Sequence, residues 1–155
     1  MSFPFSIFLL AFLLAPVAAI PCPTGFTRLV TTGQCLKMIV APLSYSDASA
    51  KCKSLGAKVL TIQNAIQNNA VLSFATASAT GNDKDYWLGL QCTTASSSSC
   101  NWADGSKFSF DGFAEGQPNN SLGTCVFVGN RGQTAGQWFS AECGLVKTNV
   151  ICEVN

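Results

Sequence analysis

Hydrophobic residues are spaced in several ways along the chain, and the first arrangement is a continuous run near the start. Phe3 to Leu14 is apolar apart from Pro4 and Ser6, and mostly small residues follow. An apolar run followed by small residues at a cleavage position is typical of a secretory signal peptide. We therefore predict a signal peptide over residues 1–19 and a mature domain over residues 20–155. The alternative is an uncleaved membrane anchor, but the run is shorter than the roughly 20 residues that span a bilayer.

Two later segments carry apolar residues at the spacing of a helix. From Ser44 to Leu55, a buried stripe is formed by Ala48, Cys52 and the final leucine. The first residue of this segment can cap the helix, and Gly56 is typical of the residue that ends one. The second segment runs from Asn64 to Ala77, and its predicted buried stripe is Ile66, Ala70, Phe74 and Ala77. We interpret both stripes as core positions and not as a cofactor site.

Short segments rich in β-branched and aromatic residues predict strands separated by polar turns. A Thr-Thr-Gly turn predicts a hairpin within Pro21 to Lys37. The other predicted strands are Val59–Ile62, Tyr86–Leu90, a strand through Phe108 and Phe110, Cys125–Val128 and Val150–Glu153. Polar or glycine-rich loops are predicted at residues 81–84, 115–124 and 130–137. Two early helices followed by several short strands indicate an α+β domain.

Charge and residue usage narrow the classes of function. The chain has 9 basic and 8 acidic residues and no basic run, so nucleic acid and anionic membrane surfaces are poor candidates as partners. It has no histidine, so catalysis would need a carboxylate pair or a Ser–Lys arrangement. Four acids were considered for that role and form no recognisable motif: Asp104, Asp111, Glu115 and Glu142. We therefore predict that the protein is not an enzyme.

All of the eight cysteines follow the predicted cleavage site. An even number of cysteines in a secreted chain predicts four disulfides. Without histidine or a CxxC spacing, a zinc site is improbable. A Cys22–Cys35 bridge would close the first hairpin locally, and Cys92 and Cys100 bracket a hydroxyl-rich loop as a local clip would. Spacing alone does not choose among the remaining pairings.

Five short motifs in order resemble the C-type lectin-like domain family over residues 22–153, with cysteines at matching positions between them. The motifs are Trp87-Leu88-Gly89-Leu90, Trp102-Ala103-Asp104-Gly105-Ser106, Gln117-Pro118-Asn119, Gln137-Trp138 before Cys143, and Ile151-Cys152-Glu153. The resemblance implies two helices packed on short antiparallel sheets, with a long loop region. It also implies the pairings Cys52–Cys152 and Cys125–Cys143, and it places the motif tryptophans, Trp87, Trp102 and Trp138, in the core.

Family members that bind sugar do so through a calcium ion held by the long loop. By resemblance, Gln117 and Asn119 would each offer it an amide oxygen, aimed by a cis Pro118. The acidic pair expected before the next cysteine is here Gly123-Thr124, and the expected Asn-Asp is here Phe139-Ser140. Calcium takes about 6–8 oxygen ligands, usually including carboxylates. We therefore expect no cofactor and at most weak calcium binding, unless one of the neighbouring acids, Asp111, Glu115 or Glu142, completes the site.

Ligand binding, if it uses the family position, would involve Gln117, Pro118, Asn119, Phe139 and Ser140. Phe139 could offer an exposed apolar contact beside the loop. Asn119 also begins an Asn-Asn-Ser sequon, which predicts an N-linked glycan in a secreted protein.

The resulting hypothesis is a secreted recognition protein that binds a glycan on cell or matrix surfaces through a degenerate calcium site. The alternative is a calcium-independent protein-binding module that uses the same loop. No part of the mature chain is predicted to insert into a membrane. With all cysteines provisionally paired, the sequence leaves the oligomeric state open.

Overall fold

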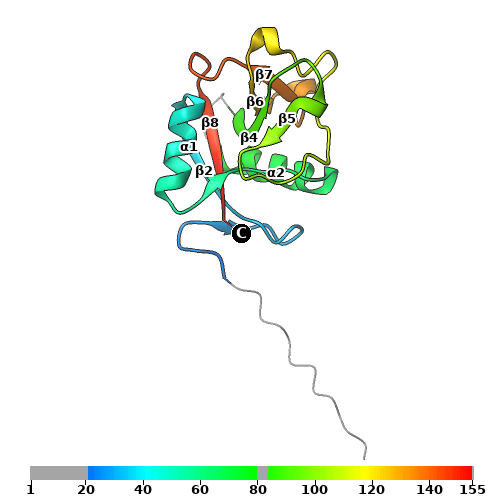
Figure 1. Ribbon diagram of the computed structural model, residues 1–155. Coiled ribbons are helices and arrows are strands. Elements are labelled where there is room, and N and C mark those ends of the chain that lie inside the picture. The colour runs from blue at the N-terminus through cyan, green and yellow to red at the C-terminus, as the bar shows by residue number, and fades with distance from the viewer. Residues whose placement is uncertain (1–20, 80–83, 155) are drawn as a thin grey trace, which may run out of the picture.

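The computed structural model describes residues 21–79 and 84–154, and in this part the chain forms an α+β domain (Figure 1). The helices are α1 (Tyr45–Ser54), α2 (Ala65–Ser78) and three 3₁₀ helices, η1 (Ser97–Ser99), η2 (Asn120–Leu122) and η3 (Gly132–Thr134). The strands are β1 (Thr27–Arg28), β2 (Cys35–Leu43), β3 (Lys58–Val59), β4 (Tyr86–Cys92), β5 (Cys100–Trp102), β6 (Cys125–Val128), β7 (Trp138–Ala141) and β8 (Thr148–Val154). The predicted signal peptide and most of the predicted loop at residues 81–84 lie outside the described residues.

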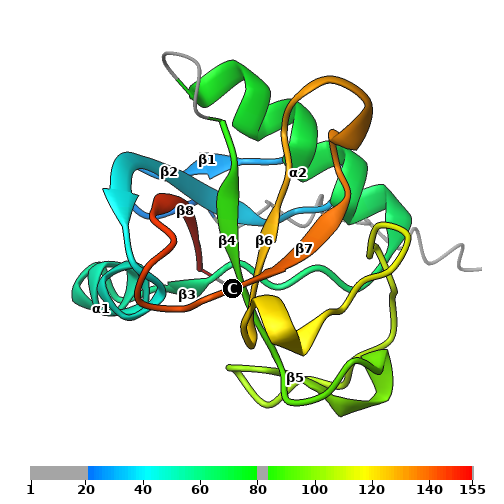
Figure 2. The ribbon, with the colours of Figure 1, turned by 90° about the horizontal axis from the view of Figure 1, so that it is seen from above.

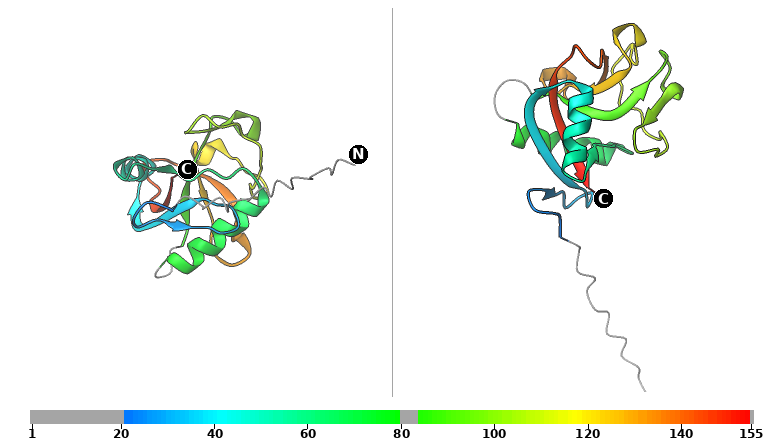
Figure 3. Two further views of the ribbon diagram at one scale, coloured as in Figure 1. Left: turned by 90° about the horizontal axis from the view of Figure 1, so that it is seen from below. Right: turned by 60° about the vertical axis from the view of Figure 1, so that its left-hand side comes forward.

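The strands of the described residues form one sheet in the order β1-β2-β8-β4-β6-β7, with β3 added to β8 and β5 added to β4 (Figure 2). Neighbouring strands are antiparallel except β4 and β8, which are parallel. The late strand β8 thus lies between two early parts of the chain. The N-terminal hairpin consequently sits beside the end of β8, where Cys35 pairs with Val154 (Figure 3).

Helix α1 begins and ends where the sequence predicts. The Ser44 side chain accepts a hydrogen bond from the Asp47 backbone N–H, which caps the first turn. Gly56 follows the helix with a positive φ of 67°, which glycine adopts without steric cost. Ala48 and Cys52 are fully buried, as predicted, and Leu55 packs partly buried against them. This helix lies beside β2 and β8, whereas α2 lies at the opposite end of the domain from η2 (Figure 1).

Helix α2 has the predicted position, but the prediction of its buried face is wrong. Ile66 is 63% exposed and Ala77 is exposed, while Ala70 and Phe74 are only partly buried. The residues that α2 buries are Asn68, Val71 and Ala75.

The rotation of α2 has a polar cause. The Asn68 Oδ1 atom accepts a hydrogen bond from the buried indole Nε1 of Trp138 at 3.0 Å, and its Nδ2 atom donates to the Gly136 carbonyl at 3.0 Å. A buried indole N–H needs a partner. The helix therefore faces the core with an asparagine, which a count of apolar positions does not detect.

Two strand predictions also need correction. The segment through Phe108 and Phe110 is extended but forms no strand, and both rings pack partly buried against the core without a neighbouring strand to pair with. Of the predicted strand Val59–Ile62, only Val59 belongs to a strand, because the ladder between β3 and β8 ends at that residue. Leu60 and Ile62 are nevertheless fully buried.

The three tryptophans are core residues, as predicted, with exposures of 0% for Trp87, 3% for Trp102 and 0% for Trp138. The ring of Trp138 is met edge-on by Trp102, Phe110 and Phe113, with centroids 5.5–5.9 Å away. Such edge-to-face contacts add about 0.5–1.5 kcal/mol each beyond the area they bury. Two rings of this aromatic cluster, Phe110 and Phe113, belong to the segment that leads into the long loop at residues 115–124.

All four predicted disulfides are confirmed: Cys22–Cys35, Cys52–Cys152, Cys92–Cys100 and Cys125–Cys143. The second joins α1 to β8 across a sequence separation of 100. In the chain-entropy account, closing a loop of that length stabilises the fold by about 4.7 kcal/mol. Among the described residues, no helix is both long and apolar enough to cross a membrane.

Candidate binding surface at the long loop

The long loop, residues 115–124, is fixed to the sheet at both ends. Before it, the Ala114 N–H donates to the Trp138 carbonyl at 3.1 Å, and Phe113 forms an isolated bridge with the same tryptophan. After it, the Cys92 N–H donates to the Thr124 carbonyl at 2.8 Å. The loop therefore bridges β7 and β4, at the upper end of the molecule in Figure 1.

The predicted site residues meet at Ser140 on β7. The Gln117–Pro118 peptide is cis, as the resemblance implied, and Pro118 is buried. The Gln117 Oε1 atom accepts a hydrogen bond from the Ser140 backbone N–H at 2.9 Å. The Asn119 backbone N–H donates to the Ser140 Oγ atom at 2.9 Å. Ser140 thus binds both residues that flank the proline, and it is itself only 6% exposed.

The side chain of Asn119 is occupied within the loop. Its Oδ1 atom accepts from the Ser121 N–H at 3.1 Å and from the Ser121 Oγ at 2.6 Å. These two bonds make Asn119 the N-cap of η2. A carbonyl oxygen has two lone pairs, so both acceptor positions of this amide are used.

Phe139 does not project from the surface as a free ring. It is partly buried and stacks on Phe127 with a centroid distance of 5.6 Å and an interplanar angle of 29°. Phe127 in turn meets Trp87 edge-on at 6.2 Å. The Phe139 ring therefore continues the aromatic core outward, and it lies against Gly129 rather than against a residue of the long loop.

Gly123 allows the loop to lie close against β7. Its φ is 126°, and a Cβ atom there would lie 2.1 Å from both the carbonyl carbon and the carbonyl oxygen of Ala141. No side chain larger than hydrogen fits in that space. The glycine that replaces an acidic ligand of the family thus has a packing role of its own.

The residues at this position do not fit a calcium ion. The oxygens of Gln117 and Asn119 already accept hydrogen bonds from the chain, and Ser140 Oγ accepts one as well. Among the described residues, no three His, Cys, Asp or Glu side chains gather in one place. One of the neighbouring acids is engaged locally, since Asp111 Oδ1 accepts from the Phe113 N–H at 3.0 Å.

Glu142 places a negative charge at the rim of the loop region. Its Oε2 atom accepts from the backbone N–H groups of Leu145 at 2.9 Å and Gly144 at 2.6 Å. These two bonds stabilise the carboxylate and lower the pKa of Glu142. Glu142 therefore stays ionised well below neutral pH, and it faces solvent.

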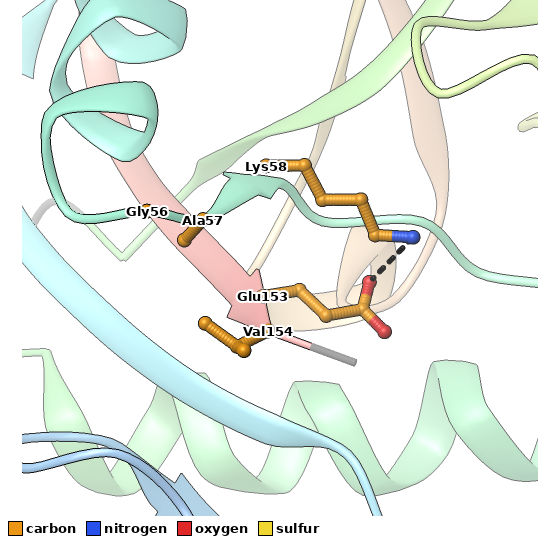
Figure 4. Close-up of a pocket in the computed structure, with 5 residues that line it drawn as sticks. All are labelled: Gly56, Ala57, Lys58, Glu153 and Val154. Atoms are coloured by element: carbon orange, nitrogen blue, oxygen red, sulfur yellow. Dashed lines mark ion pairs between the residues drawn. The ribbon is translucent and has the colours of Figure 1, made fainter.

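A second polar cluster, which the sequence did not reveal, surrounds Lys58. The Lys58 Nζ atom lies 2.6 Å from Asp104 Oδ2 and 3.9 Å from Glu153 Oε2. It borders a hollow of about 340 Å³ lined by Gly56, Ala57, Lys58, Glu153 and Val154 (Figure 4). Partial desolvation opposes ionisation of Asp104, but hydrogen bonds from Lys58 and Ser106 hold its pKa well below the usual range. The cluster joins the 104–106 turn to β3 and β8.

The family model described as the lectin C-type domain matches residues 41–154. The chain belongs to the C-type lectin domain family. This membership agrees with the fold described above. It comprises proteins that are generally non-enzymatic.

The relatives match most of this C-type lectin domain chain. C-type lectin domain-containing protein 38 of Caenorhabditis elegans is 31% identical over 136 residues, which is 86% of this chain and 34% of that protein. Ladderlectin of Oncorhynchus mykiss is 28% identical over 125 residues, which is 79% of this chain and 63% of that protein. The chain thus spans less than two thirds of the length of either relative.

Solved structures share the fold at low sequence identity. Human lithostathine superposes with a TM-score of 0.75 at 20% identity, covering 95% of this chain and 99% of the other. SPL-2 from Saxidomus purpuratus, described as a Ca²⁺-independent C-type lectin, superposes with a TM-score of 0.71 at 24% identity, covering 86% and 93%. The family thus includes members described as working without calcium.

Proposed function

We propose that this protein is a secreted glycan-recognition protein whose binding does not depend on calcium. One observation carries the proposal: the amide oxygens of Gln117 and Asn119, which a calcium ion would need, accept hydrogen bonds from Ser140 and Ser121. To bind the ion through these oxygens, the loop would have to break these bonds, and no carboxylate group is assembled around them in the described residues. A hard divalent cation such as calcium binds weakly to neutral oxygens alone.

The five predicted site residues have a defined role in this proposal. Gln117, Pro118, Asn119 and Ser140 hold the loop in one conformation, and Phe139 stacks on Phe127 in the neighbouring strand. The ligand is then contacted by the exposed residues that this frame presents, beginning with Asn120 and Ser121 on η2. A loop fixed in advance loses less conformational entropy when it binds. A soluble, neutral recognition surface of this kind needs no cofactor and no catalytic group.

The proposal is supported by the relatives but does not follow from them alone. SPL-2 is described as a Ca²⁺-independent C-type lectin. The related domain of cow CD23 was crystallised in the presence of a GlcNAc₂Man₃ oligosaccharide. A shared fold does not fix the ligand, so the binding site itself has to be tested.

The test is a calcium titration followed by glycan binding. The secreted chain is titrated with calcium by calorimetry, and its melting temperature is compared in calcium and in chelator. Immobilised oligosaccharides are then screened under both conditions. We expect no binding heat, equal melting temperatures and equal glycan retention. Binding that disappears in chelator would contradict the proposal, as would stabilisation by calcium.

A second candidate function, a protein-binding module using the same end of the domain, is favoured by exposed aliphatic residues. Leu145 is 82% exposed, Leu122 52% and Val146 36%. The segments that carry these three residues meet at Glu142. Gly123, next to Leu122, packs against the backbone nitrogen of Glu142, and the Val146 N–H donates to the Glu142 carbonyl. Capture of a protein by the wild-type chain that is lost in Leu145→Ser, with glycan binding unchanged, would support this candidate.

Secretion and glycosylation are part of the proposal. Cleavage after residue 19 would deliver the chain to an oxidising compartment, which suits its disulfides. In the sequon, the Asn119 Nδ2 atom donates to no group of the described residues, whereas Oδ1 is held by Ser121. The nitrogen that would carry a glycan is therefore not used in the fold. A glycan there would cover the family's sugar position and move recognition to a neighbouring surface.

A further inference from the structure

Next to the long loop, the ribbon of β4 and β5 presents an uncharged polar surface. Gln91 on β4 is paired with Asn101 on β5, and both are exposed while the residues before and after each are buried. Directly opposite residues of an antiparallel pair have Cβ atoms about 4.5–5.5 Å apart on the same face. The two amides therefore stand side by side and point to solvent.

The same surface continues across a disulfide to the end of the long loop. The Gln91 Nε2 atom donates weakly to Cys125 Sγ at 3.4 Å, and the Thr124 Oγ1 atom lies 3.5 Å from Cys143 Sγ. Since Cys125 and Cys143 are bonded to each other, Gln91 and Thr124 flank one disulfide. We call the surface made by Gln91, Asn101, Thr124 and this disulfide the amide face. In Figure 2 the β5 ribbon and η2 lie next to each other at this end of the domain.

The amide face keeps its hydrogen-bonding groups available. Within the described residues, the amide oxygens of Gln91 and Asn101 accept no hydrogen bond, and the Asn101 Nδ2 atom donates only to the Ser99 carbonyl at 3.2 Å. A primary amide offers two donors and one acceptor, so it can bind two neighbouring hydroxyl groups that each donate and accept. This capacity contrasts with the amides of the long loop, whose oxygens are used internally.

The face is also rigid and free of charge. The Cys92–Cys100 bridge closes the far end of the β4–β5 ribbon, and the Cys125–Cys143 bridge fixes the other edge. No Asp, Glu, Lys or Arg occurs from residue 91 to 103 or from residue 116 to 130. These two segments therefore bring neither a cation nor an anion of their own to the face.

From these observations we infer that the amide face is a calcium-independent binding site for neutral glycans. Hydroxyl-rich, uncharged rings match its donors and acceptors, and the partly exposed Cys143 half of the disulfide offers an apolar contact for the C–H side of a ring. Sulfated, phosphorylated or sialylated glycans are disfavoured, because neither segment supplies a cation to pair with their negative charge. The inference rests on the proposed function and assigns it a surface and a ligand class.

The experiment compares variants of the secreted full-length chain in chelator. The probes are immobilised neutral oligosaccharides terminating in glucose, galactose, mannose or N-acetylglucosamine, and matched sulfated and sialylated ones. The test variant is Gln91→Ala/Asn101→Ala. Its matched control is Asn69→Ala/Gln133→Ala, which removes two exposed amides elsewhere. A third variant, Asn120→Ala, probes η2.

Each outcome decides a different claim. We expect the wild-type chain to prefer neutral glycans. The test variant should bind them about tenfold more weakly, because it loses two hydrogen bonds to the ligand. The matched control should bind them within about twofold of the wild-type affinity. If only Asn120→Ala weakens binding, the amide face is refuted while the proposed function stands. A preference for anionic glycans also refutes the ligand class assigned to it. If wild type retains no glycan, both claims fail. Unchanged melting temperatures establish that the exposed substitutions act on binding and not on folding.

Discussion

Replacing Ser140 tests whether the hydrogen bonds of the loop hold it in place. The Ser140→Ala change keeps the backbone bond to Gln117 but removes the Oγ atom that accepts from the Asn119 N–H. An unpaired buried donor costs about 1–3 kcal/mol. Because Asn119 is only partly buried, we expect the lower part of that range, about 1–2 kcal/mol.

That free energy is large enough to measure. For a domain of this size, 1 kcal/mol shifts the melting temperature by about 4 °C, so a decrease of about 4–8 °C is expected. The assay is thermal unfolding by circular dichroism with the disulfides intact. The control is Ser98→Ala, which removes an exposed hydroxyl from the β4–β5 ribbon and should change the melting temperature by less than about 2 °C. Equal melting of Ser140→Ala and wild type would refute the role assigned to this bond.

Three further predictions concern other parts of the chain. Asp104→Asn should destabilise the domain at neutral pH by about 1 kcal/mol, because the carboxylate paired with Lys58 has a lowered pKa in the folded state. This stabilisation is complete above the unfolded pKa of about 4 and is lost as the pH falls below it. A difference in melting temperature that does not change with pH would contradict this cause. Gly123→Ala should prevent folding or lower the free energy of unfolding by more than about 3 kcal/mol. Gly116→Ala, where a Cβ atom would meet open space, should lower it by about 1 kcal/mol. Comparable yields and melting temperatures of the two variants would overturn the packing argument. The protein secreted from eukaryotic cells should lose mass on treatment with an N-glycosidase, and Asn119→Gln should abolish that loss; an unmodified wild type would show that the sequon is unused.

The fold was largely predictable because its signals are local or ordered along the chain. Ser44 and Gly56 mark the ends of α1 through their own backbone chemistry. The long-range disulfides Cys52–Cys152 and Cys125–Cys143 followed from the family resemblance, and the two others from their local spacing. The buried face of α2 was not predictable, since it depends on the indole of Trp138, which is distant in sequence from Asn68.

The candidate site was predictable in composition but not in bonding. The sequence indicated that Gln117, Asn119 and Ser140 belong together, and the structure brings them together. It did not indicate that their oxygens would be used by the chain itself, because that depends on side-chain directions. The pairing of Gln91 with Asn101 was likewise absent from the motifs, although alternating buried and exposed residues on both sides of a clipped hairpin could have pointed to it.

The position of β8 has a consequence for biosynthesis. This strand lies between β2 and β4 and is bonded through Cys152 to α1, so the sheet has no centre until residues 148–154 have been made. Contacts between segments so distant in sequence form slowly. Residues 148–154 must therefore have been synthesised before the sheet can be completed, and Cys52 has no native partner until Cys152 has been made. A chain truncated before Thr148 would lack the strand that joins β2 to β4, so late truncation should disrupt the sheet as severely as a large substitution in its core.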